Sequence, residues 1–399
     1  MASVRSVAVQ VARAVASGVT RIESAAETDL ILTVNIASDG DAFNLRGAGT
    51  LSYDCTVDWG DGSSDAIVTT SADTESALTH TYATAGTYTI RVSGTFPAIR
   101  MGDSTTRTAL ITVENLGVVG WAASGLRSGF EFCNRMTSFT AGNTDTSAVN
   151  DMYRTFRLCD RATSIDLRGM DTSLVTTMES LFHDCNALTT LNLSGFQTGN
   201  VVTFTSIFHD CKLLTSIDVS GFDTSSAQGM RSMFAQCESV TSLDLSNFDT
   251  SGVFSFANMF DRCGDLTSLD ISSFDTSSAL DFSLMFSGAN SLSAIDVSNF
   301  DTSSATNFRR MFRSVSATDI RCDLFDISAA TNLSDFLQNS ALTTARYDAV
   351  LLAWDAQTVN SGLSVNFGSS EFTGGGAAEA ARTSLINNDG WTISDGGAA

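Results

Sequence analysis

One pattern of apolar and polar residues recurs through most of the chain, and one copy of it is LTSIDVSGFDTSSAQGMRSMFAQC, residues 214–237. The apolar positions of its first part fit the buried side of a short strand and are Leu214, Ile217 and Val219. The second part has apolar residues at steps of three and four, as a helix with one buried stripe does, at Ala227, Met230, Phe234 and Cys237. The pattern predicts a unit of strand, turn and short helix.

This unit repeats every 26 residues, and the cysteines that keep the step are Cys133, Cys159, Cys185, Cys211, Cys237 and Cys263. A fixed period of this length is typical of a solenoid, because one unit cannot bury its apolar side alone and stacked units can. We expect roughly eight coils between residues 130 and 342. The last coil is one residue shorter, since Asp326 follows Asp301 after 25 residues.

Before the repeats, residues 29–115 alternate apolar and polar residues between turn formers, which predicts strands at 30–36, 51–59, 87–92 and 109–113. In VDWGDGSS (57–64), Asp58 and Asp61 should bond turn amides. In HTYATAGTYTIRV (80–92), Tyr82 and Tyr88 should pair across a hairpin, with His80 bonded inside it. These segments resemble the polycystic-kidney-disease (PKD) type of immunoglobulin-like sandwich, which implies a spacer or adhesion module.

The two ends of the chain differ from the repeats. Residues 343–399 contain an expected amphipathic helix at 346–357, a second helix near 377–387 and a strand at 390–393, and we expect them to cap the last coil. Residues 1–28 are basic before Glu23, through Arg5, Arg13 and Arg21. They are interpreted either as a short helix packed on its own domain or as an anchor that docks the acidic body onto another assembly. A cleaved signal peptide is disfavoured, because Gln10 and Arg13 interrupt the apolar stretch.

The repeat motif is L-T-S-L-D-L-S-x-F-D-T-S followed by M-F-x-x-C, and it recurs at residues 214–225, 240–251, 266–277 and 292–303. It resembles the BspA-type leucine-rich repeats of bacterial and phage surface proteins, which implies recognition through a repeat surface and no chemistry. The expected fold class is an α/β, leucine-rich-repeat-like solenoid over residues 116–342, with 26-residue coils of strand plus short helix. An all-β immunoglobulin- or PKD-like sandwich precedes it.

The net charge of the chain argues against some classes of binding partner. The 399 residues carry 44 acidic and 22 basic side chains, a formal net charge of −22, although 43% are hydrophobic. This balance argues against general binding of nucleic-acid phosphates and against broad docking on an anionic membrane. No run of apolar residues reaches the ~18 that a membrane span requires.

The eight cysteines are interpreted as buried thiols rather than disulfides or zinc ligands. Later coils replace the repeated cysteine with small apolar residues, at Ala289, Val315 and Ala341. Consecutive cysteines also lie in a line on separate coils, whereas a zinc site needs tetrahedral corners.

The aspartates of the D-T-S motif should bond the amides of the turn that leads into each helix, and calcium bridging of the repeated aspartates is the alternative. The candidates for calcium are Asp58, Asp61, Asp218, Asp244 and Asp270. No other metal and no cofactor is expected. His183 and His209 occupy a variable, exposed position of neighbouring coils and are not expected to bind a metal.

Comparison of the coils separates uniform positions, typical of a scaffold, from variable ones, which could form a contact surface or reflect drift. The candidate contact residues are Arg154, His183, His209, Asn258 and Arg310. We expect a non-enzymatic phage virion protein, such as a tail fibre, receptor-binding or capsid-decoration protein. Its solenoid would bind a host-surface protein or glycan, residues 1–28 would bind other virion or surface proteins, and a homo-oligomer is compatible. The alternative is a bacterial cell-surface or secreted BspA-like adhesin that binds host or matrix proteins.

Overall fold

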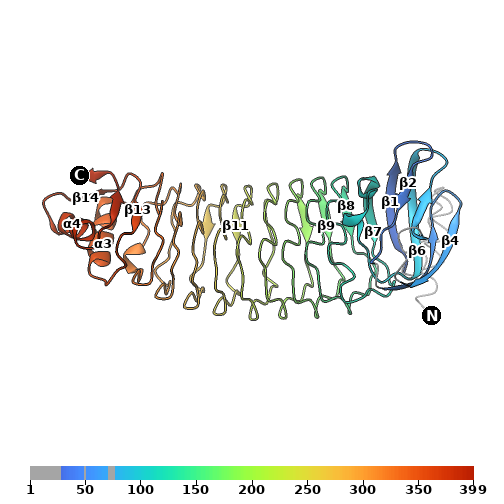
Figure 1. The fold of residues 1–399 in the computed structure, drawn as a ribbon, viewed down its shortest axis with the longest axis horizontal. Helices are drawn as coiled ribbons and strands as arrows, with labels where there is room; N and C mark the ends of the chain where they lie inside the picture. Colours follow the sequence, from blue (N-terminus) through green and yellow to red (C-terminus); the bar gives the residue numbers. More distant parts are fainter. Residues whose placement is uncertain (1–27, 49–50, 71–76) are drawn as a thin grey trace, which may run out of the picture.

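The computed structural model describes residues 28–48, 51–70 and 77–399, which form one elongated rod (Figure 1). Strands of an all-β part lie at one end, a stack of coils forms the middle, and two helices lie at the other end. The expected basic anchor, with Arg5, Arg13 and Arg21, lies outside the described residues. No helix of the described part has the length and apolar character that crossing a membrane requires.

The all-β end contains the four strands that the pattern predicts. They are β1 (Leu30–Ile36), β3 (Ser52–Asp58), β6 (Gly86–Thr95) and β7 (Leu110–Asn115). These join β4 (Ser64–Thr70) in one sheet, and only β2 (Ala42–Asn44) and β5 (Thr79–Thr81) pair outside it. Two short 3-10 turns lie between β6 and β7, namely η1 (Met101–Asp103) and η2 (Arg107–Ala109). Among the described residues, this arrangement does not reproduce the two full sheets expected of an immunoglobulin-like sandwich.

Strand β7 joins the all-β end to the coils. It pairs antiparallel with β1 on one side and parallel with β8 (Ser138–Thr140) on the other. The parallel ladder continues through β9 (Ser164–Asp166) and β10 (Thr190–Asn192). In later coils β11 (Ser242–Leu243) and β12 (Ser268–Leu269) form a separate parallel pair. The first coil therefore presents no unpaired strand edge, which is the hazard that an open stack has to avoid.

The short helix expected in each coil is not present, and this corrects the predicted fold class. Within residues 116–342 the only helical turn is the 3-10 segment η3 (Cys322–Leu324). Backbone N–H groups instead alternate between two kinds of partner. Phe208 N donates to Met233 O of the next coil at 3.1 Å, and His209 N donates to Ser206 O within its own coil at 3.3 Å.

Two residues of the turn adopt the left-handed conformation, for example Ser206 with φ 55° and Asp210 with φ 61°. An α-helix would use every interior N–H inside one coil and leave none for the neighbour. Hydrogen bonds between coils stabilise the stack, so the chain forms successive turns that leave alternate amides free to bond to the neighbouring coil. The apolar steps of three and four are the same in both arrangements, which is why the sequence pattern could not separate them.

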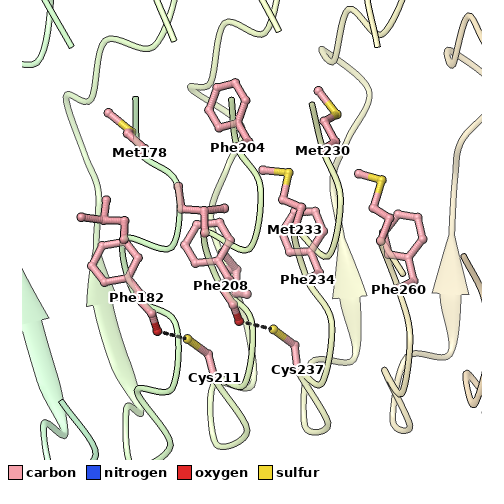
Figure 2. Close-up of a cluster of buried hydrophobic side chains, with 14 of the residues drawn as sticks. Met178, Phe182, Phe204, Phe208, Cys211, Met230, Met233, Phe234, Cys237 and Phe260 are labelled. Carbon is pink, nitrogen blue, oxygen red and sulfur yellow. Dashed lines mark hydrogen bonds between the residues drawn. The ribbon is translucent and has the colours of Figure 1, made fainter. Parts of the chain in front are cut away.

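The interior of the stack is a column of aromatic rings (Figure 2). The rings of Phe182 and Phe208 lie parallel with centroids 5.8 Å apart, and Phe234 and Phe260 continue the column at 6.0 Å. The cysteines line its side, and the Sγ of Cys211 donates to the carbonyl oxygen of Phe182 at 3.3 Å. All eight cysteines are free and buried, which confirms the interpretation as buried thiols.

The C-terminal end contains the two expected helices, α3 (Thr344–Asp355) and α4 (Ala377–Asn387). Four short strands accompany them: β13 (Ser364–Asn366), β14 (Glu371–Phe372), β15 (Thr392–Ser394) and β16 (Gly397–Ala398). Val365 forms a parallel bridge with Leu333 of the last regular coil, and β13 then pairs with β15. The ladder between coils thus continues into this region, and Trp354 of α3 packs edge-on against Phe336.

Candidate interaction surface

One side of each coil carries the repeated aspartates, and their carboxylates are occupied by the chain itself. Oδ1 of Asp218 accepts from the N–H and the hydroxyl of Ser220, at 3.1 and 2.7 Å. Asp244 and Asp270 repeat the contact with Ser246 and Ser272. The bond from the Ser220 hydroxyl, followed by the one from its amide, lowers the pKa of Asp218. The bond to a turn amide predicted for the aspartates of the D-T-S motif is confirmed as well, since Ser225 N donates to Oδ1 of Asp223 at 3.0 Å, although no helix follows this turn.

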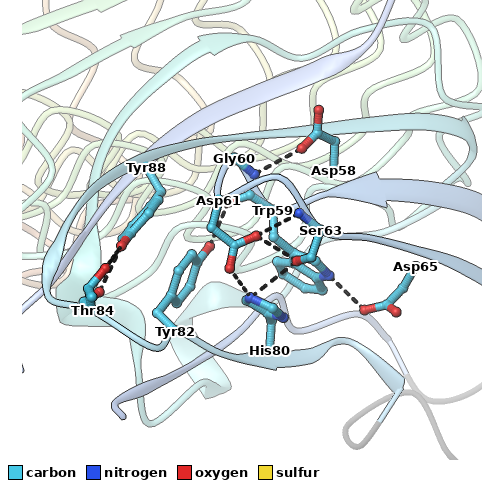
Figure 3. Close-up of polar contacts among 10 residues, drawn as sticks. All are labelled: Asp58, Trp59, Gly60, Asp61, Ser63, Asp65, His80, Tyr82, Thr84 and Tyr88. Atoms are coloured by element: carbon cyan, nitrogen blue, oxygen red, sulfur yellow. Dashed lines mark hydrogen bonds and ion pairs between the residues drawn. The ribbon is translucent and has the colours of Figure 1, made fainter. Parts of the chain in front are cut away.

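The carboxylates of the two calcium candidates in the all-β end also accept hydrogen bonds from turn residues (Figure 3). Asp58 accepts from Gly60 N at 2.9 Å, and Asp61 accepts from Ser63 N at 2.9 Å. Asp61 also contacts Nε2 of His80 at 2.7 Å. His80 therefore bonds to the turn after β3, and the prediction that it bonds within residues 80–92 is wrong. Ser63, with His80 after it, lowers the pKa of Asp61 to about 2.

Aromatic packing explains the rest of this motif. His80 stacks on Trp59 with ring centroids 5.0 Å apart, and Tyr82 stacks on Tyr88 at 4.2 Å, which confirms the predicted tyrosine pair. A glycine is required at position 60, because φ is 80° and a Cβ would lie 2.5 Å from the carbonyl oxygen of Thr89. The hairpin predicted over residues 80–92 is not formed, because β5 pairs with β2 while β6 pairs with β1 and β3. The cluster thus ties the turn after β3 to the segment between β5 and β6 and serves the fold.

The variable residues of the coils lie in a second region, the corner segment, which we define as residues 204–212 and their equivalents in the other coils. Arg154, Asn258 and Arg310 all occupy its first left-handed position, with φ of 55–59°. The same position is buried where it is Ser180 or Ser232, so side chains at this position are less exposed than the sequence suggests. Most basic residues of the coils lie in this segment, namely Arg127, Arg154, Arg157, Arg231, Arg262, Arg309, Arg310, Arg313 and Lys212.

Of the candidate contact residues, only His183 and His209 contact each other in the structure, and the others lie apart. Arg154 lies over the ring of Tyr153 at 4.6 Å, and Nε of Arg310 contacts Oδ2 of Asp335 at 3.0 Å. Asn258 lies four coils from Arg154 and two coils from Arg310, at one coil per 26 residues. His183 and His209 are in edge-to-face contact, with centroids 4.3 Å apart. Asp210 lies beside His209, a neighbour that the list of sequence candidates omits although it follows His209 in the chain.

The described residues show no arrangement typical of a hydrolase. Ser63 and Asp61 both face Nε2 of His80, at 3.5 and 2.7 Å, whereas a nucleophile and an orienting acid need opposite nitrogens of the ring. Two open surface hollows of about 580 and 280 Å³ lie beside α4 and beside β2. Neither has a histidine or cysteine among its lining residues.

Comparison with known proteins gives one family. A profile described as "Mycoplasma protein of unknown function, DUF285" matches residues 124–243 and 229–354, which together cover more than half of the chain. The matched span coincides with the coils and α3. No curated protein and no solved structure matches the chain.

Proposed function

Because this chain belongs to the DUF285 family, whose BspA-type repeats build its coils, we propose that it is a non-enzymatic recognition protein. In this proposal it is a phage virion component, as a tail fibre, receptor-binding or capsid-decoration protein, and its coils contact a protein or glycan on the host surface. The PKD-like segment over residues 29–115 acts as a spacer. Residues 1–28 attach the rod to the particle.

The observation that carries the proposal is the division of each coil into a uniform side and a variable corner segment. On the uniform side the same Asp–Ser contact recurs from coil to coil, as in Asp218–Ser220 and Asp244–Ser246, so these acids are engaged in turns. In the corner segment the same backbone position accommodates Arg154, Asn258 or Leu284. A backbone fixed by bonds between coils can vary its side chains without altering the fold, which is what a tunable contact surface needs.

The distribution of basic residues also supports the corner segment as the contact surface. The protein is strongly acidic, yet most basic residues of its coils lie in the corner segment. Arg127 and Arg154 flank the ring of Tyr153 at 4.4 and 4.6 Å, which presents two cations and an aromatic face together. Arginine and tyrosine are the side chains most enriched at binding hot spots.

The contact surface can be tested with matched substitutions. Arg154→Ser and Arg310→Ser introduce the residue that other coils already have at this position, so the fold should tolerate them. Binding of the labelled protein to cells of a panel of bacterial strains should fall at least about 10-fold in the double variant. The control Asp218→Asn, on the uniform side, should bind as the parent does. Equal losses in both variants would contradict the proposed surface.

The location can be tested separately by mass spectrometry of gradient-purified virions. We expect this chain in the particle in stoichiometric amounts, and the same chain with residues 1–28 deleted should fold and be missing from it. Detection only in the cell envelope or the culture medium of a bacterium would instead favour the surface adhesin.

A further inference from the structure

The two adjacent histidines of the corner segment form the strongest unexplained cluster in the described part of the chain. His183, His209 and Asp210 each offer a ligand atom within 4.8 Å of the other two. His209 Nδ1 lies 3.2 Å from Oδ2 of Asp210, and His183 Nε2 lies 3.4 Å from Oδ2 of Asp184. Two imidazole nitrogens and a carboxylate are thus brought together from two coils.

The hydrogen bonding of this cluster is incomplete. Nδ1 of His209 is buried and has no hydrogen-bond partner, because its contact with Asp210 lacks the required geometry. A buried ring nitrogen without a partner is unfavourable unless something at the site binds it.

The stacking of coils explains why the cluster occurs once. The position of His209 is Arg157, Ala235, Asp261, Ser287 or Arg313 in other coils, so adjacent imidazoles arise only between His183 and His209. The next position, that of Asp210, has a left-handed backbone with φ of 61°, and its carboxylate lies beside the ring that precedes it. Gln236 of the following coil reaches the same carboxylate at 3.0 Å and limits its movement.

We propose that His183, His209 and Asp210 bind a zinc ion that links two adjacent coils. Two imidazoles and one carboxylate are a common ligand set for Zn²⁺, whereas Ca²⁺ prefers six or more oxygens. Ligand atoms around tetrahedral zinc lie closer together than 4.8 Å, so binding requires small side-chain rotations. With three protein ligands, the fourth position faces solvent, since the side chains of His183 and His209 are 22% and 21% exposed.

The eight cysteines do not compete for the ion in the folded protein, because all of them are buried. Lys212 contacts the other carboxylate oxygen, Oδ1 of Asp210, at 3.2 Å. This contact leaves Oδ2 on the side of the histidines, where it accepts from Nε2 of Gln236 at 3.0 Å, a bond that the zinc ion would replace. The site does not depend on the proposed function, since it is a property of two coils and not of a partner.

The test is a calorimetric titration of the chelator-treated, full-length protein with ZnCl₂ at pH 7.5. We expect one ion per chain and a rise in melting temperature. His209→Ala, which introduces the residue present at Ala235, should weaken binding by at least about 10-fold, and Asp210→Gln, which introduces the residue present at Gln236, should do the same. His80→Ala removes the third histidine of the chain, and binding should be unchanged.

Folding of the variants is checked by their melting without zinc, which should lie close to that of the parent because other coils contain the same residues. Absence of one-to-one binding, or equal binding by the parent and His209→Ala, would overturn the proposal. Equally strong binding of CaCl₂ would also overturn it, because it would point to a site made of carboxylates alone.

Discussion

The hydroxyl of Thr224 forms two hydrogen bonds with the backbone of Asp249 in the next coil. Its Oγ1 donates to the carbonyl oxygen of Asp249 at 2.9 Å and accepts from the amide N of the same residue at 2.8 Å. Thr198 makes the same pair of bonds with Asp223. The threonines of the D-T-S motif are buried and therefore connect the coils, a role that the sequence analysis did not assign to them.

Thr224→Val should destabilise the protein by about 2 kcal/mol, because it keeps the shape of the side chain and leaves an amide and a carbonyl of Asp249 without their partner. Urea denaturation measures the change. Thr224→Ser keeps the hydroxyl and should cost less. If the valine variant were as stable as the parent, the two bonds would contribute nothing to the stacking of the coils.

Cys211→Ala should cost about 1–2 kcal/mol, since it removes a buried sulfur and its bond to the carbonyl oxygen of Phe182. Cys211→Ser should cost less, because a hydroxyl can form the same bond. The last regular coil provides the precedent: Ser340, rather than the Ala341 inferred from the sequence, occupies the cysteine position and donates to Phe312 O at 2.8 Å. A larger loss for serine than for alanine in urea denaturation would show that the thiol acts only as an apolar group.

Stability should fall as the pH rises above 9. Burial raises the pKa of Cys55 from 9.0 to about 11 and that of Cys263 from 9.0 to about 12. Since the folded pKa exceeds the unfolded one, the protonated thiol stabilises the fold fully below pH 9.0, and this stability is lost as the pH approaches the folded value.

Urea midpoints at pH 7.5, 9 and 10.5, with a reducing agent present, measure this loss. Cys263→Ala should show a shallower decline than the parent over the same range. Identical slopes for the two proteins would assign the decline to other groups, such as the buried tyrosines.

Arg382→Met should destabilise the C-terminal end by about 3 kcal/mol. Asp395 is almost fully buried, and its Oδ2 contacts Arg382 Nε at 2.7 Å and accepts from the Tyr347 hydroxyl at 2.6 Å. Loss of the arginine leaves a buried negative charge without its cation. Thermal melting measures the effect, and adding Asp395→Asn to Arg382→Met should restore part of the stability. A further loss of equal size in the double variant would show that the two residues act independently.

The sequence predicted the repeat, its period, the strands β1, β3, β6 and β7, and the two terminal helices, because each depends on local pattern and composition. It could not predict β4, whose role depends on pairing with β3 across the turn at Gly60. For the candidate surface, the sequence indicated individual residues but not which of them lie in contact. The contact between His183 and His209, and the orientation of Asp210 toward them, depend on how one coil lies on the next.

What the sequence by itself determined is that the coils share a period of 26 residues, with one shorter coil at the end, and that most of them place phenylalanine, cysteine and aspartates at the same points, since a fixed period stacks like on like. Only the tertiary structure decided the conformation between those points. A segment such as 204–211 has the apolar spacing of a helix, yet half of its amides bond to the neighbouring coil. A hydrogen bond to another coil becomes available only once the coils are stacked, so no inspection of one repeat could have revealed it.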